Sequence, residues 1–134
     1  MAVAGWILDK SAAARIDAEA VAEALRSLTE PLHICPVGEL EQLYSAKSAR
    51  DYDRLKTELR SAFAVVTAPP DVFERALELQ QDLAHHHGMW HRTPIPDLLI
   101  AETALHHELG VVHIDGDFDR ITTVRPLTVR RLSA

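Results

Sequence analysis

Val111-Val112-His113-Ile114-Asp115-Gly116-Asp117 is a short apolar run that stops at an acidic turn. A continuous apolar run of this length, bounded by a turn, is typical of a strand buried on both faces of a sheet. The N-terminal stretch Trp6-Ile7-Leu8-Asp9 has the same pattern, because three apolar residues end at an aspartate. The two stretches therefore predict two buried strands, each followed directly by an acid.

Other short apolar runs alternate with segments of helical periodicity. Residues 32–35 and 64–66 are predicted strands, and the segments between strands place apolar side chains three and four residues apart. Strands that alternate with helices are typical of a parallel sheet covered on both faces. We expect a polar loop at 85–93 and an edge strand around Pro126, within the tail 122–129. The predicted helices span residues 18–28, 37–46, 48–63, 71–83 and 97–109.

Length and composition predict one soluble domain, residues 1–134. The chain is 47% hydrophobic and 25% charged, which is ordinary for a globular domain and argues against disorder. Cys35 is the single cysteine, so an internal disulfide and a four-cysteine zinc site are both excluded. No apolar run approaches the roughly 18 residues of a membrane span, and we expect no signal peptide. These observations predict a cytoplasmic protein that does not enter a membrane.

Negative charge is concentrated in one part of the chain. The formal net charge is −6, and residues 61–119 hold 10 acidic but only 2 basic residues. An acidic chain is a poor candidate for binding nucleic acid through bulk charge. The excess of carboxylates is therefore either a solvated face or a place where cations supply the missing positive charge.

Several acids of the chain are expected at the edge of the sheet where ligands bind. Asp9 and Asp115 follow predicted strands, and Asp97 begins a predicted helix; in open parallel sheets, ligands bind beyond the carboxyl ends of the strands. Each acid by itself could simply cap a helix or a turn. Together they predict a carboxylate cluster, which needs a counter-cation such as Mg²⁺. A pair of such ions about 4 Å apart can activate water for phosphodiester cleavage.

Four stretches of the chain resemble the PIN-domain ribonucleases, and within them the VapC-type toxins of VapBC toxin–antitoxin modules. The resemblance covers nearly the whole chain, and the order and spacing of the stretches are more specific than any one of them. The stretches are Trp6–Ala12, Ile34–Ala46, Pro94–Ala101 and Val112–Asp119.

The resemblance implies a fold, an activity and partners. It implies a three-layer α/β sandwich whose central, mostly parallel sheet of four to five short strands is flanked by helices. It also implies an endoribonuclease that depends on Mg²⁺ or Mn²⁺, cuts transfer or ribosomal RNA, and leaves a 5′-phosphate and a 3′-hydroxyl. The expected partners are a cognate VapB-type antitoxin and a second copy of the chain in a homodimer.

The resemblance also assigns roles to particular residues. Asp9, Asp97 and Asp115 match the family's first, third and fourth acids and are the expected ligands of the principal metal ion. The family's second acid precedes an aliphatic-aliphatic-Tyr-Gly/Ser stretch, which aligns with Glu41, although Glu39 stays an alternative because Gln42 departs from the pattern. Two further matches complete the set: Asp117 at a second metal position, and Ser11 as a hydroxyl that orients Asp9 or a metal-bound water.

Other features have competing interpretations. The run 85–87 together with His91 could hold zinc, but consecutive histidines on a helix point in different directions. His91 and Arg92 could instead contact an RNA phosphate near Asp97. Asp119 is interpreted as a cap of the helix that follows it.

Two other functions compete with the nuclease. The first is a catalytically weak PIN-like module that binds RNA or a protein partner. The second is a phosphatase of the haloacid-dehalogenase type, which would need an aspartate at the position occupied by Ser11. The complete set of acids favours the nuclease over both.

Overall fold

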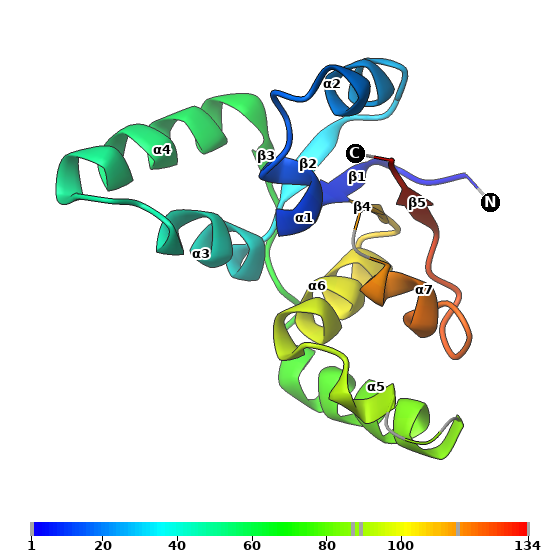
Figure 1. Ribbon diagram of the computed structural model, residues 1–134. Coiled ribbons are helices and arrows are strands. Elements are labelled where there is room, and N and C mark those ends of the chain that lie inside the picture. Colours follow the sequence, from blue (N-terminus) through cyan, green and yellow to red (C-terminus); the bar gives the residue numbers. More distant parts are fainter. Residues whose placement is uncertain (1, 87, 89, 115, 134) are drawn as a thin grey trace.

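Five short strands form one parallel sheet in the part of the chain that the structure describes. The structure is a computed structural model, and it describes residues 2–86, 88, 90–114 and 116–133. Across the sheet the strand order is β3-β2-β1-β4-β5, and each pair of neighbours runs parallel (Figure 1). The predicted parallel sheet is thereby confirmed. Its strands are β1 (Trp6–Leu8), β2 (Leu32–Ile34), β3 (Ala64–Val65), β4 (Gly110–His113) and β5 (Val129–Arg131).

The strand β1 lies at the centre of the sheet, with β2 on one side and β4 on the other. Trp6 pairs with Leu32 of β2 and with Gly110 of β4. The pairing with β4 continues past the end of β1, because the backbone N–H of Asp9 donates to the carbonyl oxygen of Val112 at 2.9 Å. The sheet therefore holds the backbone of Asp9 in place at its carboxyl edge.

Alternate residues of the central strands enter two separate apolar layers. Ile7 and Val111 belong to one cluster of buried side chains, whereas Leu8 and Val112 belong to the other. This alternation follows from the twofold periodicity of a strand, whose successive side chains point to opposite faces. Since both faces are buried here, β1 is apolar throughout and β4 is apolar up to its last residue, His113.

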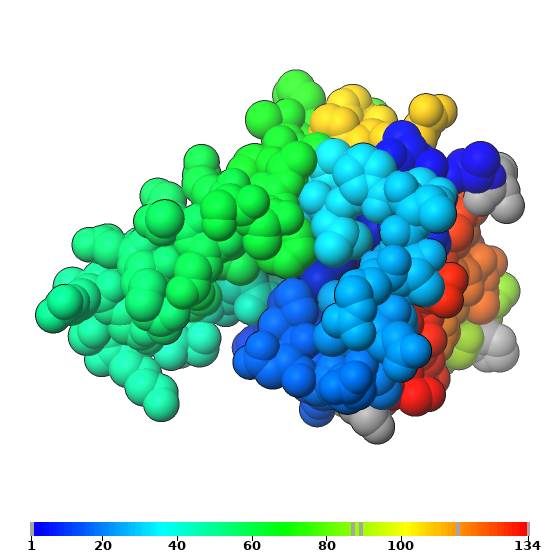
Figure 2. Space-filling view, turned by 90° about the horizontal axis from the view of Figure 1, so that it is seen from above, coloured from blue at the N-terminus to red at the C-terminus, as the bar shows by residue number. Residues whose placement is uncertain are grey.

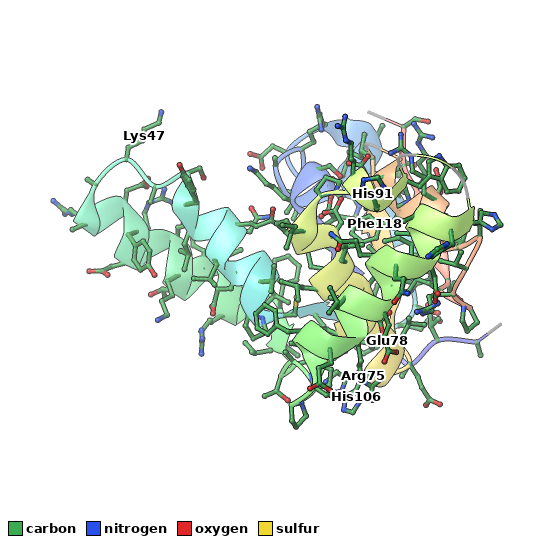
Figure 3. All side chains as sticks on the ribbon, turned by 90° about the horizontal axis from the view of Figure 1, so that it is seen from below. Lys47, Arg75, Glu78, His91, His106 and Phe118 are labelled. Carbon is green, nitrogen blue, oxygen red and sulfur yellow. The ribbon has the colours of Figure 1, made fainter. Side chains whose placement is uncertain are left out.

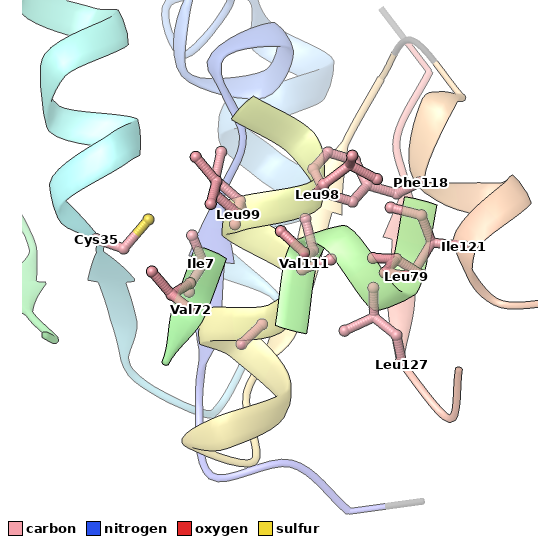
Figure 4. Packing of buried hydrophobic residues seen from close by; sticks show 14 of the residues in the cluster. Ile7, Cys35, Val72, Leu79, Leu98, Leu99, Val111, Phe118, Ile121 and Leu127 are labelled. Carbon is pink, nitrogen blue, oxygen red and sulfur yellow. The ribbon is translucent and has the colours of Figure 1, made fainter. Parts of the chain in front are cut away.

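Three helices cover the first face: α5 (Val72–His86), α6 (Ile95–His106) and α7 (Asp117–Ile121). Their side chains Leu79, Leu98 and Phe118 pack with Ile7 and Val111 (Figure 4). The helix α6 is buried from Asp97 to Ala104, so it forms the middle of this layer. None of the helices in the described ranges is both long and apolar enough to cross a membrane.

Helices from the first half of the chain cover the second face. They are α1 (Lys10–Ala13), α2 (Glu19–Arg26), α3 (Pro36–Tyr44) and α4 (Ala49–Ala62). Val21, Leu43 and Leu59 from this group pack with Leu8 and Val112 of the sheet. Helices on both faces of the sheet give the predicted three layers (Figure 1).

The helices α3 and α4 also form an arm that projects from the rest of the molecule. Figure 2 shows this arm, in cyan and green, extending to one side, and Figure 3 places Lys47 at its far end. Near the body, Arg60 of α4 binds Glu39 of α3 through two hydrogen bonds of 2.8 Å. At the far end, the Ser48 side chain caps α4 by accepting a hydrogen bond from the backbone N–H of Asp51.

Two details of the predicted fold are wrong. The last strand is Val129–Arg131 and lies after Pro126, not around it. Proline has no N–H to donate to a sheet, and pairing with β4 begins only at Val129. The segment predicted as a polar loop at 85–93 is partly helical, because α5 continues to His86 and a 3₁₀ turn, η1, spans Trp90–Arg92.

Candidate active site

Asp9 stands between the end of β1 and the start of α1. It is the N-cap of α1, and its carboxylate oxygen Oδ2 accepts hydrogen bonds from the backbone N–H of Ser11 at 3.1 Å and from the Ser11 hydroxyl at 2.8 Å. Only 3% of the residue is exposed. A carboxylate buried to this degree needs compensating hydrogen bonds or a cation.

Ser11 joins Asp9 to the segment that follows β4. While the Ser11 hydroxyl donates to Asp9, its oxygen accepts a hydrogen bond from the backbone N–H of Ile114 at 2.9 Å. One side chain thus fixes the orientation of the Asp9 carboxylate and the path of the chain beyond β4. Ile114 immediately precedes Asp115, which lies outside the described residues.

Asp97 lies in the first turn of α6. Its backbone N–H donates to the carbonyl oxygen of Pro94 at 3.0 Å, and 6% of the residue is exposed. Proline at the beginning of a helix is favourable because the first N–H groups have no partner within the helix. An acid in the first turn is favourable because of the partial positive charge at that end. Local sequence therefore explains why the helix places an acid here.

Acids from four separate elements line one surface pocket. Asp9 follows β1, Glu41 comes from α3, Asp97 from α6 and Asp117 from α7, and the pocket has a volume of about 420 Å³. Its remaining lining residues are Lys10, Ser11, Ala14, Arg15 and Pro94. We call this depression the acidic pocket. It lies beyond the carboxyl end of β1, where an open parallel sheet binds its ligands.

The donor atoms of the acidic pocket suit a hard divalent cation. Carboxylate oxygens are the protein ligands of Mg²⁺, which is usually held by one or two of them, with water and substrate phosphate completing its shell. Within the described ranges, no three His, Cys, Asp or Glu side chains are arranged to hold a metal ion by themselves. Asp115, the remaining expected ligand, lies outside the described residues.

The region that carries these acids matches a known family. The model of the PIN domain matches residues 4–124. The chain belongs to the PIN domain family. Ribonuclease VapC17 of Mycobacterium tuberculosis is 60% identical to it over 121 residues, which cover 90% of each protein. Ribonuclease VapC21 of the same organism is 40% identical, over 89% of this chain and 87% of the relative.

Solved structures resemble this PIN domain in fold. VapBC2 from Rickettsia felis, bound to a DNA fragment from its promoter, gives a TM-score of 0.73 at 14% sequence identity. The match covers 94% of this chain and 97% of that chain. The predicted PIN-like α/β sandwich is therefore confirmed.

The two glutamates of α3 have different environments. Glu41 lines the acidic pocket of the PIN domain, whereas Glu39 does not and forms an ion pair with Arg60 at 2.8 Å. The hydrogen bonds from Arg60 lower the pKa of Glu39 below its usual value. This geometry favours Glu41 over Glu39 as the second acid.

His91 and Arg92 do not line the acidic pocket. His91 lines a separate depression with residues of α5, among them Leu77 and Gln81, and Arg92 is exposed at the end of η1. Figure 3 labels His91 on the side of the molecule seen from below. Although they are near Asp97 in sequence, they do not line the acidic pocket with it. The structure therefore gives no support to their role as phosphate contacts.

The cations that line the acidic pocket are Lys10 and Arg15, and neither was a predicted site residue. Both residues are exposed, and Arg15 Nη1 donates to the carbonyl oxygen of Ser11 at 3.1 Å. A signal was present in the sequence, because Lys10 directly follows Asp9 and Arg15 comes just after the short helix α1 that Asp9 caps. The pocket therefore combines four acids with two exposed positive side chains.

Proposed function

We propose that this PIN domain is an endoribonuclease that hydrolyses RNA phosphodiester bonds with the help of Mg²⁺ or Mn²⁺. The observation that carries the proposal is the meeting of Asp9 and Asp97, both nearly buried, in one pocket with Glu41 and Asp117. Carboxylate oxygens gathered in one pocket are the protein ligands that a hard divalent cation takes. The relatives named ribonuclease VapC support the activity.

Each acid has a distinct role in this proposal. Asp9 and Asp97, together with Asp115, would hold the principal ion. Glu41 and Asp117 would bind this ion directly or through water, and Asp117 would also complete a second metal position. When bound, the ion lowers the pKa of water and stabilises the charge that develops at the scissile phosphate. Ser11 keeps the Asp9 carboxylate turned into the pocket. No side chain is required as a covalent nucleophile.

The proposal extends to partners and substrate. The structural neighbours include VapBC complexes from several bacteria, and the function is that of a toxin neutralised by a cognate VapB-type antitoxin. We further propose transfer or ribosomal RNA as the substrate class, a homodimer as the assembly and the cytoplasm as the place of action. A basic side chain of the antitoxin that reaches the acidic pocket would be electrostatically complementary to it.

The direct test is cleavage of RNA with and without the metal. Purified protein is incubated with total cellular RNA in Mg²⁺ or Mn²⁺, and again with EDTA, beside an Asp97→Asn variant purified in the same way. We expect discrete fragments that require the metal and are absent with the variant, and sequencing of their ends identifies the substrate. Failure of the folded, metal-supplied protein to cut would favour an RNA- or partner-binding module. Cleavage that persists with the variant would indicate a contaminating nuclease or a wrongly assigned site.

Lys10 and Arg15 are expected to bind RNA phosphate at the rim of the acidic pocket. Each phosphate contact with single-stranded nucleic acid contributes about 0.7 to the slope of log K against log salt concentration. Lys10→Ala and Arg15→Ala, measured in the non-cleaving Asp97→Asn background, should each lower that slope by about 0.7 and weaken binding at low salt. The measurement is fluorescence anisotropy of a labelled RNA across a salt series.

Lys47 provides the matched control for this experiment, because it is a cation at the far end of the arm (Figure 3). Lys47→Ala should leave the slope unchanged. Equal slopes for all the variants would show that the two cations of the pocket do not contact RNA.

A further inference from the structure

The turn after β4 determines where the Asp117 carboxylate lies. Gly116 is the N-cap of α7 and has a φ of 91°, a conformation that favours glycine, and Asp117 is the first residue of the helix. The helix has only five residues, too few to be stable by itself in water. Contacts with the rest of the molecule must therefore hold Asp117 at the acidic pocket.

A buried histidine provides one of these contacts. His113 is fully buried at the end of β4, and its Nδ1 accepts a hydrogen bond from the backbone N–H of Gly116 at 3.3 Å. Because Nδ1 is the acceptor, the proton of the neutral ring is on Nε2, which lies 3.6 Å from Asp119 Oδ1. The ring thus accepts a hydrogen bond from the turn and faces the Asp119 carboxylate in the middle of α7. Asp119 does not cap the helix, contrary to the sequence-based interpretation.

An arginine from the last strand provides the other contact. Arg131 pairs with His113 in the sheet, and its Nη1 lies 3.3 Å from Asp119 Oδ2. Its Nε donates to the carbonyl oxygen of Ile114, also at 3.3 Å. The guanidinium lies directly over Gly116, since a Cβ added there would be 3.0 Å from Arg131 Cζ. Arg131 therefore holds both sides of the turn.

We propose that His113, Asp119 and Arg131 form a brace that positions Asp117 for a divalent cation in the acidic pocket. The three are positioning residues and do not line the pocket themselves. Asp119 is the shared element, because one of its carboxylate oxygens faces the histidine and the other faces the arginine. This inference rests on the proposed function, and it adds a role for the C-terminal strand. Residues that orient metal ligands typically change metal affinity about 10- to 100-fold when replaced.

The test is the affinity of the whole protein for Mn²⁺, measured by electron paramagnetic resonance without RNA. Arg131→Ala and Asp119→Asn are suitable variants, because 58% and 44% of their side chains are exposed and the fold does not depend on burying them. Each should raise the Kd for Mn²⁺ about tenfold. The double variant should raise the Kd for Mn²⁺ no more than the stronger single variant does, because both changes break the same brace.

Arg130→Ala is the matched control. It removes an exposed arginine from the same strand, outside the brace, and should change the Kd less than about twofold. Amide chemical shifts of Gly116 and Asp117 give a second readout, and they should move in the brace variants but not in Arg130→Ala. Wild-type affinity in folded brace variants would overturn the brace while leaving the nuclease proposal intact. Absence of Mn²⁺ binding by the wild-type protein would overturn both.

Discussion

Replacing Asp97 by Asn is expected to lower the rate of metal-dependent RNA cleavage by about a thousandfold or more. The two side chains have nearly the same shape, so the change removes a charge and little else. Stabilisation of transition-state charge by a bound ion is worth several kcal/mol, and each 1.4 kcal/mol or so lost is a factor of ten in rate. The loss should appear in kcat/KM for a defined RNA substrate at saturating Mn²⁺.

The same substitution should abolish stabilisation of the fold by metal. An ion that binds only the native state raises stability by about 2.7 kcal/mol at a hundred times its Kd. We therefore expect Mn²⁺ to raise the Tm of the wild-type protein and to leave that of the variant nearly unchanged. Without metal the variant should have nearly the wild-type Tm, because it loses repulsion between carboxylates and also loses the favourable charge in the first turn of α6.

Asp53→Asn is the matched control for Asp97→Asn, since it makes the same chemical change at an exposed position of α4. It should retain wild-type cleavage and the wild-type response of Tm to Mn²⁺. If Asp97→Asn kept more than a tenth of the wild-type rate, Asp97 would not be a metal ligand.

The parts of the site that follow from strand ends were predictable from sequence. Asp9 comes directly after a buried strand, and parallel strands bring their carboxyl ends to one edge of the sheet. Asp97 was predictable for a related reason, because a proline-led helix start near this edge keeps its first turn at the pocket. In both cases a short stretch of sequence predicts where the acid lies on its strand or helix. The parallel sheet then brings the two acids to the same edge.

The residues that sequence reasoning missed or misplaced depend on the register of distant segments. The contact of Arg131 with the turn at Gly116 exists only because β5 pairs with β4 from Val129 onward. The predicted strand lies around Pro126, so the sequence did not place Arg131 in the sheet beside this turn. His91 is close to Asp97 in sequence, but it lines a depression with residues of α5 and not the acidic pocket.

Ser11→Ala is expected to weaken both the fold and the binding of metal. The hydroxyl is the partner of two groups, the Asp9 carboxylate at 2.8 Å and the Ile114 backbone N–H at 2.9 Å. Alanine leaves the N–H group without this acceptor, which costs about 1–3 kcal/mol when such a group is buried. It also removes the shorter of the two hydrogen bonds that Ser11 donates to the Asp9 carboxylate, for which we expect a loss of about 10- to 100-fold in Mn²⁺ affinity.

Two variants separate these effects from a general loss of helix stability. Ser45→Ala removes a hydroxyl that bonds only the backbone of its own helix, at Gln42, and should change neither Mn²⁺ affinity nor cleavage. Ser11→Thr keeps the hydroxyl and should restore most of the affinity. Chemical denaturation gives the free energy of unfolding, and Mn²⁺ titration gives the Kd. If Ser11→Ala matched Ser45→Ala in both measurements, the Ser11 hydroxyl would not be what holds Asp9 in the pocket. Burial of the Asp9 carboxylate by the surrounding residues would then have to hold it there.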